Sequence, residues 1–512
     1  MLRTGRNAWR VISLARTLAR YDALFPLERL NLPRWTMWTS ERLAHSHRTK
    51  MRPGQRLAAA LQQMGPSFIK FGQSLSTRPD LVGEEIAGDL GQLRDRLPPF
   101  AAHQARDTIE SALQQPIAAL FKSFDNQPTA AASIAQVHAA TTADGRDVMV
   151  KVLRPDIEDR FRRDIDFFAW LASLLERIQP DFKRLRARDV VDIFASTVTI
   201  ETDLRLEGAA AAELAENFSN DRTFQVPEVD WDRTERQVLT AARIQGIPIE
   251  DRDALIAGGR DPEVIVGNLL RAFFNQVFRD GFFHADLHPG NLFVDSDDNI
   301  VAVDFGIMGR LDKANRRFVA ELLLAFLVGD YRRAAEIHYE AGYVPQSQSV
   351  EVFAQACRSI GEPVLRQGTK AVSIGRLLAQ LFQITRTFEM QTQPQLLLLQ
   401  KTLVVVEGVA RQLNPDGNLW ETAEPLLAEH VRDQLGPETR LREGLEEAGD
   451  FARRLPRLVE KAETAAALVS DEGLRLHPES ARAIAAEQVR RRRPWQIAAI
   501  VSAAALLLLW VL

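Results

Sequence analysis

The chain has 512 residues, a formal net charge of -4 and a single cysteine, Cys357. The near-neutral charge gives no global electrostatic reason to bind nucleic acid. One cysteine excludes both an intrachain disulfide and a cysteine zinc cluster, and fits a reducing compartment. The length suggests about three domain-sized units, with ample length for buried cores.

Residues 1–50 are a basic, amphipathic N-terminal segment. Five arginines fall on one arc of a helical wheel: Arg3, Arg6, Arg10, Arg16 and Arg20. The opposite arc is apolar, with Val11, Leu14, Ala15 and Leu18. Such a helix can lie on an anionic membrane surface, and a mitochondrial transit peptide shows a similar pattern. A basic solvated face on an ordinary helix explains the pattern equally well, so all three interpretations stay open.

Residues 51–125 are expected to be a helical extension, with breaks at Gly65-Pro66, Pro79 and Pro98-Pro99. Within it, Lys70 and Gln73 lie three residues apart and so share one helical face. Taken alone, two polar residues on an amphipathic helix need no functional explanation.

Residues 126–245 read as a small lobe that contains β-strands. Ile134–Ala140 and Asp147–Leu153 favour strands and are joined through Ala143-Asp144-Gly145, which predicts a hairpin. A helical stretch follows to about residue 217, and residues 237–239 with 247–249 suggest a further strand and the connection to a second lobe.

The second strand of this hairpin ends in Lys151, which matches the position of the lysine that contacts ATP phosphates in kinases. Glu207 is the best candidate for its charge partner on the next long helix, and Asp203, one turn earlier, shares its face. On one continuous helix Glu201 lies about 160° from Asp203 and is expected to point elsewhere.

Residues 246–470 are expected to form a helical large lobe that carries the most informative motif. Asp286 is followed after four residues by Asn291, and then by Asp304-Phe305-Gly306. This is the order and spacing of a kinase catalytic centre. Asp286 would act on the nucleophile, while Asn291 and Asp304 supply the hard oxygen ligands that suit Mg2+.

Two elements of an ordinary protein kinase are missing. A glycine-rich loop is replaced by residues 129–138, which contain no glycine, and alanine adopts a positive φ with difficulty. No Ala-Pro-Glu follows Gly306, and a helix-like stretch begins at Asn315. We therefore expect a stiff loop over the phosphates and no long activation segment on which a peptide could dock.

The C-terminus predicts a membrane anchor at 495–512, after a charged juxtamembrane segment at 471–494. Residues 497–512 are apolar except for Ser502, and four arginines precede them at 490–493. At about 1.5 Å per residue such a helix is slightly shorter than a ~30 Å hydrocarbon core. A docked core helix or an interfacial helix is the alternative. The arginines would keep the preceding chain on the cytoplasmic side.

Together these motifs resemble the UbiB family, also called the aarF-domain-containing kinases, which are atypical kinase-like proteins linked to ubiquinone biosynthesis. The resemblance covers about residues 55–330. Four features carry it in order: the KxGQ signature at 70–73, the alanine-rich loop at 130–138, the ExD element at 201–203 and the catalytic loop at 284–291.

The resemblance implies an α+β fold: a two-lobed, protein-kinase-like structure with an N-terminal helical extension and a C-terminal transmembrane helix. Lys70 and Gln73 would belong to an extension that folds across the active site, with Glu201 as partner of Lys70. Asp286, Lys151 and Glu207 would be catalytic, and Asn291 with Asp304 would bind the metal. Nucleotide-site candidates are Thr129, Ala130, Ala131, Ala132, Ser133, Ile134, Ala135, Gln136, Val137, Lys151, Lys70, Gln73, Glu201 and Asp203.

Two positions depart from the family pattern. Thr240-Ala241-Ala242-Arg243 replaces the acidic and aromatic hinge of related sequences, so adenine recognition would rest on backbone contacts. One C-terminal span is apparent where relatives often have two.

The resulting hypothesis is a membrane-anchored, ATP-binding and Mg2+-dependent ATPase, or a small-molecule or lipid kinase, that supports ubiquinone biosynthesis. Expected partners are membrane lipids, ubiquinone intermediates and other biosynthetic proteins, with no nucleic acid. The expected location is the bacterial inner membrane with the kinase-like domain in the cytoplasm, or alternatively the mitochondrial inner membrane. A protein Ser/Thr kinase that regulates ubiquinone enzymes and a nucleotide-gated, non-catalytic scaffold remain as alternatives.

Overall fold

The computed structural model describes residues 2–24, 51–76, 82–91, 93, 97–178, 187–366, 388, 390, 393–415, 417, 422–423, 425–426, 428–429, 469–470 and 473–474. The chain divides into two units, Met1–Val431 and Arg432–Leu512. In the second unit, β12 (Val469–Ser470) pairs antiparallel with β13 (Gly473–Leu474). All other described elements belong to the first unit.

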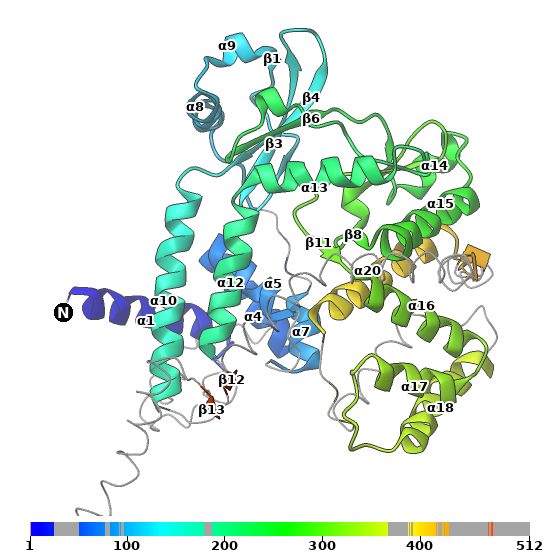
Figure 1. The fold of residues 1–512 in the computed structure, drawn as a ribbon. Coiled ribbons are helices and arrows are strands. Elements are labelled where there is room, and N and C mark those ends of the chain that lie inside the picture. Colours follow the sequence, from blue (N-terminus) through cyan, green and yellow to red (C-terminus); the bar gives the residue numbers. More distant parts are fainter. Residues whose placement is uncertain are drawn as a thin grey trace, which may run out of the picture. The chain divides into compact units, whose positions relative to one another are not determined.

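The small lobe is built on a five-stranded antiparallel sheet (Figure 1). Its strand order is β1-β3-β4-β6, and β2 also pairs with β3. The bounds are β1 Phe121–Phe124, β2 Ala130–Ala131, β3 Ala135–Thr142, β4 Asp147–Leu153 and β6 Val238–Ala242. The predicted hairpin is confirmed, because β3 and β4 pair in a register that places Val137 opposite Lys151.

One face of this sheet packs on helices that precede it. Val148, Val150 and Val152 alternate along β4 and are buried against Ile109 and Leu120, as the two-residue period of a strand requires. These partners lie in α8 (Ala102–Leu113) and α9 (Ile117–Leu120). The helices α8 and α9, and strand β1, fall within the segment expected to be a separate extension, so the small lobe includes residues before 126.

A helical layer lies on the other face, where α13 (Leu204–Asn217) crosses the sheet (Figure 1). The helices α10 (Ile157–Ile178) and α12 (Ala187–Glu201) pack against each other. The expectation of one continuous helix through 201–207 was wrong. Helix α12 ends at Glu201, and Asp203 caps α13 by accepting a hydrogen bond from the Arg205 N–H. A short acidic side chain satisfies an otherwise unpaired amide at such a helix start.

The extension contains α4 (Pro53–Met64), α5 (Pro66–Ser76) and α7 (Glu84–Leu90). Phe71 of α5 stacks on Phe168 of α10, with 4.8 Å between ring centroids, and its ring edge meets Phe194 of α12 at 5.3 Å. Gly72 faces the opposite way, where a Cβ would lie 2.5 Å from Leu93 Cδ1. The absent side chain lets α5 approach its neighbours closely, and the aromatic face fixes α5 to the lobe.

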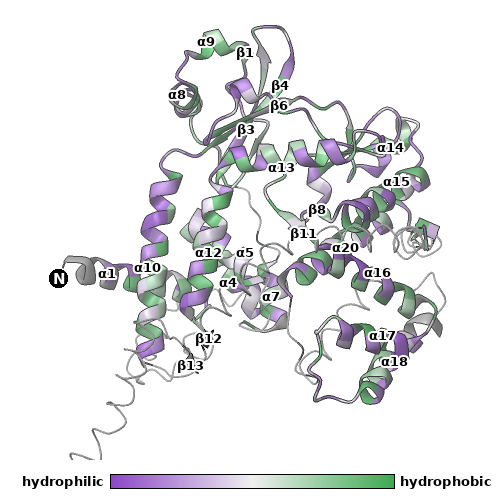
Figure 2. Ribbon diagram, viewed as in Figure 1, coloured by the Kyte–Doolittle hydropathy of each residue, from purple (hydrophilic) through white to green (hydrophobic). Residues whose placement is uncertain are grey.

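The N-terminal helix α1 (Leu2–Arg20) packs mainly on α4 and meets α10 through individual side chains. Arg10 forms an ion pair with Asp164, and its guanidinium carbon lies 4.5 Å from the centroid of the Phe167 ring. Part of the basic arc of α1 is therefore used within the protein, while Trp9 remains 63% exposed. Along α10, Figure 2 shows hydrophilic and hydrophobic residues interleaved, the pattern of a helix with one buried and one solvated face.

The large lobe holds mostly helices, with two small sheets of order β5-β10-β9-β7 and β11-β8. Its strands are β5 (Phe224–Gln225), β7 (Ile247–Pro248), β8 (Phe282–His284), β9 (Leu292–Val294), β10 (Ile300–Ala302) and β11 (Met308–Arg310). The helices include α14 (Arg252–Ala257), α15 (Pro262–Phe274), α16 (Lys313–Leu327), α17 (Tyr331–Glu340), α18 (Val350–Arg366) and α20 (Pro394–Leu413). The π-helical η2 (Asn275–Asp280) and the short η3 (Pro289–Asn291) complete it, while η1 (Trp231–Arg233) packs on β6 of the small lobe.

Among the helices that the structure describes, none combines the length and the apolar character needed to cross a membrane. The anchor expected at 495–512 lies outside the described residues.

Candidate active site

Three charged side chains from distant parts of the chain meet at the centre of the site. Lys151 Nζ on β4 lies 2.7 and 2.9 Å from the two carboxylate oxygens of Glu207 on α13. The same Nζ lies 2.9 Å from Asp304 Oδ1, which follows β10. Side-chain exposure is 16% for Lys151, 9% for Glu207 and 50% for Asp304. One ammonium therefore bridges a buried and an accessible carboxylate.

The charges of this cluster shift one another's pKa. Burial opposes the charged form of Lys151, but Asp304 and Glu207 outweigh it and raise the lysine pKa. Attraction by Lys151 holds the pKa of Asp304 well below its usual range. Burial raises the pKa of Glu207 to about 7, because Lys151 compensates only partly and Asp304 repels it. The lysine and Asp304 are thus ionised at neutral pH, while Glu207 can take up a proton.

His284 is fully buried and fixes the catalytic loop through two hydrogen bonds. Its Nδ1 accepts a hydrogen bond from the Asp286 N–H at 3.1 Å, so its Nε2 carries the proton and donates to Val303 O at 3.3 Å. Burial lowers the pKa of His284 and favours this neutral form. The ring links the backbone before Asp304 directly to the backbone of Asp286.

Asn291 completes this arrangement. Its Nδ2 donates to the main-chain oxygen of Asp286 at 3.1 Å, and its own carbonyl accepts a bond from the Val303 N–H at 2.9 Å. Asp304 has a φ of +64°, a left-handed conformation that is costly outside glycine. The strained backbone turns the Asp304 carboxylate toward Lys151. The three motif residues predicted from their spacing are therefore assembled in one place.

The donor types at this place fit Mg2+. Asp286 and Asp304 provide carboxylates and Asn291 an amide oxygen, and Mg2+ prefers such hard oxygen ligands. Within the described ranges no cluster of three or more His, Cys, Asp or Glu residues is placed to hold a metal. A bound ion would be held by Asn291 and Asp304, with the carboxylate of Asp286 beside them.

The extension reaches the same cluster through Lys70. Lys70 Nζ lies 3.1 Å from Glu201 Oε2, and both side chains are almost buried, at 11% and 12% exposure. The charge of Lys70 also contributes to the lowered pKa of Asp304. Gln73, on the same face of α5, donates to Leu93 O at 3.3 Å. The contact of Lys70 with Glu201 is present as expected, although Glu201 ends one helix rather than lying inside a longer one.

The alanine-rich loop forms the tight β2–β3 turn, in which the Ala132 N–H donates to Ala135 O at 2.8 Å. Residues 129–138 contain no positive φ, as their composition predicts. Arg154 clamps this turn: its Nε and one Nη donate to Ala132 O at 3.1 and 2.8 Å, and it also donates to Pro98 O at 2.9 Å. Sequence reasoning missed Arg154, whose only signal was its place three residues after Lys151.

Two nucleotide-site candidates, Gln136 and Asp203, have partners within the protein. Gln136 is fully buried, accepts from the Phe100 N–H at 3.0 Å and lies 2.8 Å from His138 Nε2. Neighbouring residues of a strand face opposite sides, so Val137 shares the face of Lys151 and Gln136 does not. Asp203 caps α13 and is paired with Arg205 at 2.8 Å. Both side chains have structural partners here.

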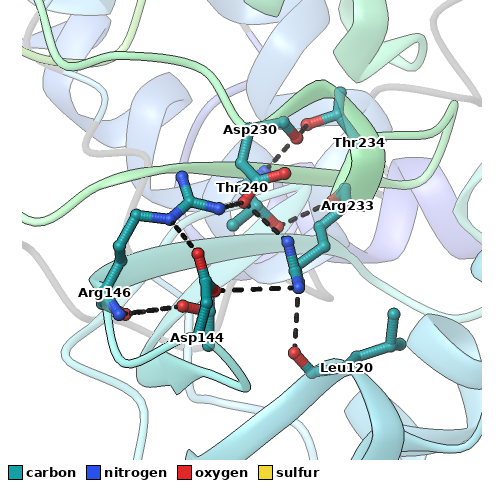
Figure 3. Close-up of polar contacts among 8 residues, drawn as sticks. Leu120, Asp144, Arg146, Asp230, Arg233, Thr234 and Thr240 are labelled. Atoms are coloured by element: carbon teal, nitrogen blue, oxygen red, sulfur yellow. Dashed lines mark hydrogen bonds and ion pairs between the residues drawn. The ribbon is translucent and has the colours of Figure 1, made fainter.

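A second charged network joins the β3–β4 turn to the loop before β6 through Asp144, Arg146, Asp230 and Arg233 (Figure 3). Asp230, 5% exposed, accepts bonds from Arg146 at 2.8 Å and Arg233 at 2.9 Å. Thr240, at the start of the segment expected to be the hinge, donates to Arg233 O at 2.7 Å. This side chain is therefore hydrogen-bonded to the loop that follows β5.

The fold has two lobes, and its site joins a lysine–glutamate pair to Asp286, Asn291 and Asp304. This combination defines an atypical kinase-like protein. Residues 92–338 match the model of the ABC1 atypical kinase-like domain, and residues 357–418 match that of the UbiB helical domain. The chain belongs to the UbiB family.

The family is shown by relatives over nearly the whole chain. The chain is 42% identical over 518 aligned residues to the "Probable protein kinase UbiB" of Marinobacter nauticus, covering 97% of this chain and 93% of that protein. It is 44% identical over 412 residues to the Aeromonas hydrophila protein of the same name, covering 80% and 76%. The solved complex of Rv3197 with erythromycin from Mycobacterium tuberculosis has a TM-score of 0.51 at 24% identity, covering 77% of this chain and 97% of that one. That likeness shows a shared fold.

Proposed function

We propose that this protein carries out ATP-dependent phosphoryl chemistry, with ATP hydrolysis as its basic reaction, in support of ubiquinone biosynthesis. The observation that carries the proposal is the meeting of Lys151, Glu207 and Asp304 beside Asp286 and Asn291. Residues 153 positions apart are brought within hydrogen-bond distance there. Lys151 and Glu207 are nearly buried there, whereas the carboxylate of Asp304 is half accessible.

The residues divide the work in the following way. Lys151 neutralises phosphate oxygens and Glu207 keeps its ammonium in place, while Asn291 and Asp304 hold Mg2+. Bound Mg2+ would neutralise charge that develops on the phosphates. Asp286 orients the attacking oxygen and accepts its proton. Asp304 is 50% exposed, so its carboxylate could hold a metal ion as well as contact Lys151.

The phosphate acceptor is proposed to be water or a lipid-like intermediate. Strand β11 pairs with β8 directly after Gly306, and α16 begins at Lys313. This short path leaves little chain on which a peptide could dock. Lys70 of the extension also lies close enough to influence Asp304.

The proposed setting is the cytoplasmic face of the bacterial inner membrane, with residues 495–512 as anchor; the mitochondrial inner membrane is the alternative. Its basis is the apolar run after the arginines at 490–493. Membrane lipids, ubiquinone intermediates and ubiquinone biosynthetic proteins are the proposed partners.

Phosphate release from ATP tests the proposal. Full-length protein with Mg2+ should release phosphate, with and without lipid vesicles, and Asp286→Asn should lower the rate by at least about a hundredfold. The substitution is nearly isosteric, so the thermal midpoint should stay close to that of the parent. Equal rates in the two proteins, or no release by either, would refute the proposal.

The relatives are named probable protein kinases, which favours protein phosphorylation as a second candidate function. Labelled phosphate should then appear on a ubiquinone biosynthetic protein mixed with this chain. Transfer that disappears in Asp286→Asn would favour protein phosphorylation over hydrolysis.

A further inference from the structure

Thr402 of α20 is fully buried, and the roles described above do not use it. It belongs to the stretch that matches the UbiB helical domain, whereas Asp286 belongs to the kinase-like domain. Its Oγ1 donates to the main-chain oxygen of Ala285, 117 positions earlier, at 3.2 Å. Strand β11, which pairs with β8 just before the catalytic loop, also packs on α20 (Figure 1). A buried hydroxyl of the helical domain therefore reaches the catalytic loop.

The oxygen that Thr402 contacts belongs to the peptide group that joins Ala285 to Asp286. The N–H of the same peptide group donates to His284 Nδ1 at 3.1 Å. Ala285 is 1% exposed, and among the described residues no other hydrogen bond is made to its carbonyl. A buried carbonyl without a donor is unfavourable. The peptide group directly before the Asp286 side chain is thus held from both sides, by His284 and by Thr402.

The hydroxyl of Thr402 has a second acceptor within its own helix. Leu398 O, one turn earlier in α20, lies 2.9 Å away, and a threonine inside a helix commonly returns its hydroxyl to this position. Leu398 O also accepts the helical bond of the Thr402 N–H, whereas Ala285 O depends on the hydroxyl. One hydrogen is therefore shared between the helix and the catalytic loop.

We infer that Thr402 is a positioning residue for Asp286: through the Ala285–Asp286 peptide group, its hydroxyl sets the direction in which the Asp286 carboxylate faces the attacking oxygen. The inference rests on the proposed function, since it concerns the same reaction. Rotation of a peptide group moves the side chain that follows it, and a misplacement of about 1 Å can cost about a hundredfold in rate. Helix α20 thereby takes part in the geometry of the catalytic centre.

Three substitutions separate this role from simple packing. Thr402→Val keeps the shape of the side chain but removes the hydroxyl, and Thr402→Ala removes it in a smaller side chain. Thr402→Ser keeps the hydroxyl and loses only a methyl group. Thr108→Val is the matched control, because Thr108 Oγ1 of α8 donates to Gln104 O, one turn earlier, also at 2.9 Å. Among the described residues, this hydroxyl makes no bond outside its own helix.

The test compares turnover with binding in the full-length proteins. With Mg2+, Thr402→Val and Thr402→Ala should each release phosphate from ATP with a kcat about tenfold below that of the parent. Their KM for ATP and Kd for ADP should stay within about twofold of the parent values, because the groups proposed to hold the phosphates and the metal are Lys151, Asn291 and Asp304. Thr402→Ser should keep most of the parent rate, and Thr108→Val all of it.

A parent-like kcat in Thr402→Val or Thr402→Ala would overturn the inference, and so would an equal fall in Thr402→Ser. Loss of ADP binding in both variants that lack the hydroxyl would assign Thr402 to structural support of the fold and would overturn it as well. None of these results touches the proposed function, which fails if the parent and Asp286→Asn release phosphate at equal rates or not at all.

Discussion

Replacing Glu207 by Gln should make the free energy of unfolding fall less between pH 5 and pH 8 than it does in the parent, while impairing nucleotide chemistry. Glu207 is 9% exposed, and its pKa rises from 4.5 to about 7, first because of burial. A carboxyl whose pKa is higher in the folded chain stabilises the fold most below pH 4.5. That contribution disappears as the pH rises through about 7.

The magnitude follows from this difference. A rise from 4.5 to about 7 corresponds to about 3 kcal/mol between the two protonation states. The pair with Lys151 is tightly coupled, so we expect about 1–3 kcal/mol. Glutamine carries no charge and avoids this cost. The free energy of unfolding of Glu207→Gln, relative to the parent, should therefore increase by that amount between pH 5 and pH 8.

Urea unfolding followed by tryptophan fluorescence at several pH values measures this difference. Glu213→Gln is the matched control, since Glu213 lies on the same helix, is 41% exposed and pairs with Arg310. Its effect should be small and the same at each pH. Parallel stability curves for Glu207→Gln and the parent from pH 5 to pH 8 would refute the reasoning.

Three further predictions concern stability and the alanine-rich loop. Asp230→Ala should cost about 2–4 kcal/mol in unfolding free energy, because Arg233 is left almost buried without its closest carboxylate. Asp144→Ala should cost clearly less, because Asp144 is exposed; equal costs would contradict the network of Figure 3. Gly72→Ala should cost about 1–3 kcal/mol in the same assay, since its Cβ would meet Leu93 Cδ1 at 2.5 Å; an unchanged value would show that the leucine side chain or α5 moves away freely. Arg154→Gln should speed amide hydrogen exchange in residues 130–135, because the clamp on Ala132 O is removed; unchanged exchange would show that the turn is stiff without Arg154.

The catalytic loop could be read from the sequence because its parts are local. Asp286 and Asn291 share one tight turn, and Asp304 follows a strand that returns directly beside them, so spacing alone implies proximity. The hairpin that carries Lys151 is equally local, since β3 and β4 are joined by a short turn. Alanine in place of glycine predicted a loop without positive φ, and this prediction is confirmed, because none of residues 129–138 has a positive φ.

Helix ends could not be read in this way. A helical wheel assumes a continuous helix, but Asp203 caps a new helix after Glu201. Whether an acidic residue lies inside a helix or begins one depends on where the neighbouring helices turn. The wheel therefore misplaced Asp203, while Glu207 remained correct because it lies within α13.

Contacts between distant segments were decided only by tertiary packing. The bond of Lys151 to Asp304 joins residues 153 positions apart, and the clamp of Arg154 on the alanine-rich loop depends on three separate segments meeting. Periodicity shows that a helix or strand has two faces, but it does not show which partner each face will meet. The chemical groups and their local spacing are written in the sequence, whereas the burial that raises the pKa of Glu207 exists only once the sheet, α13 and the Asp304 loop have packed together.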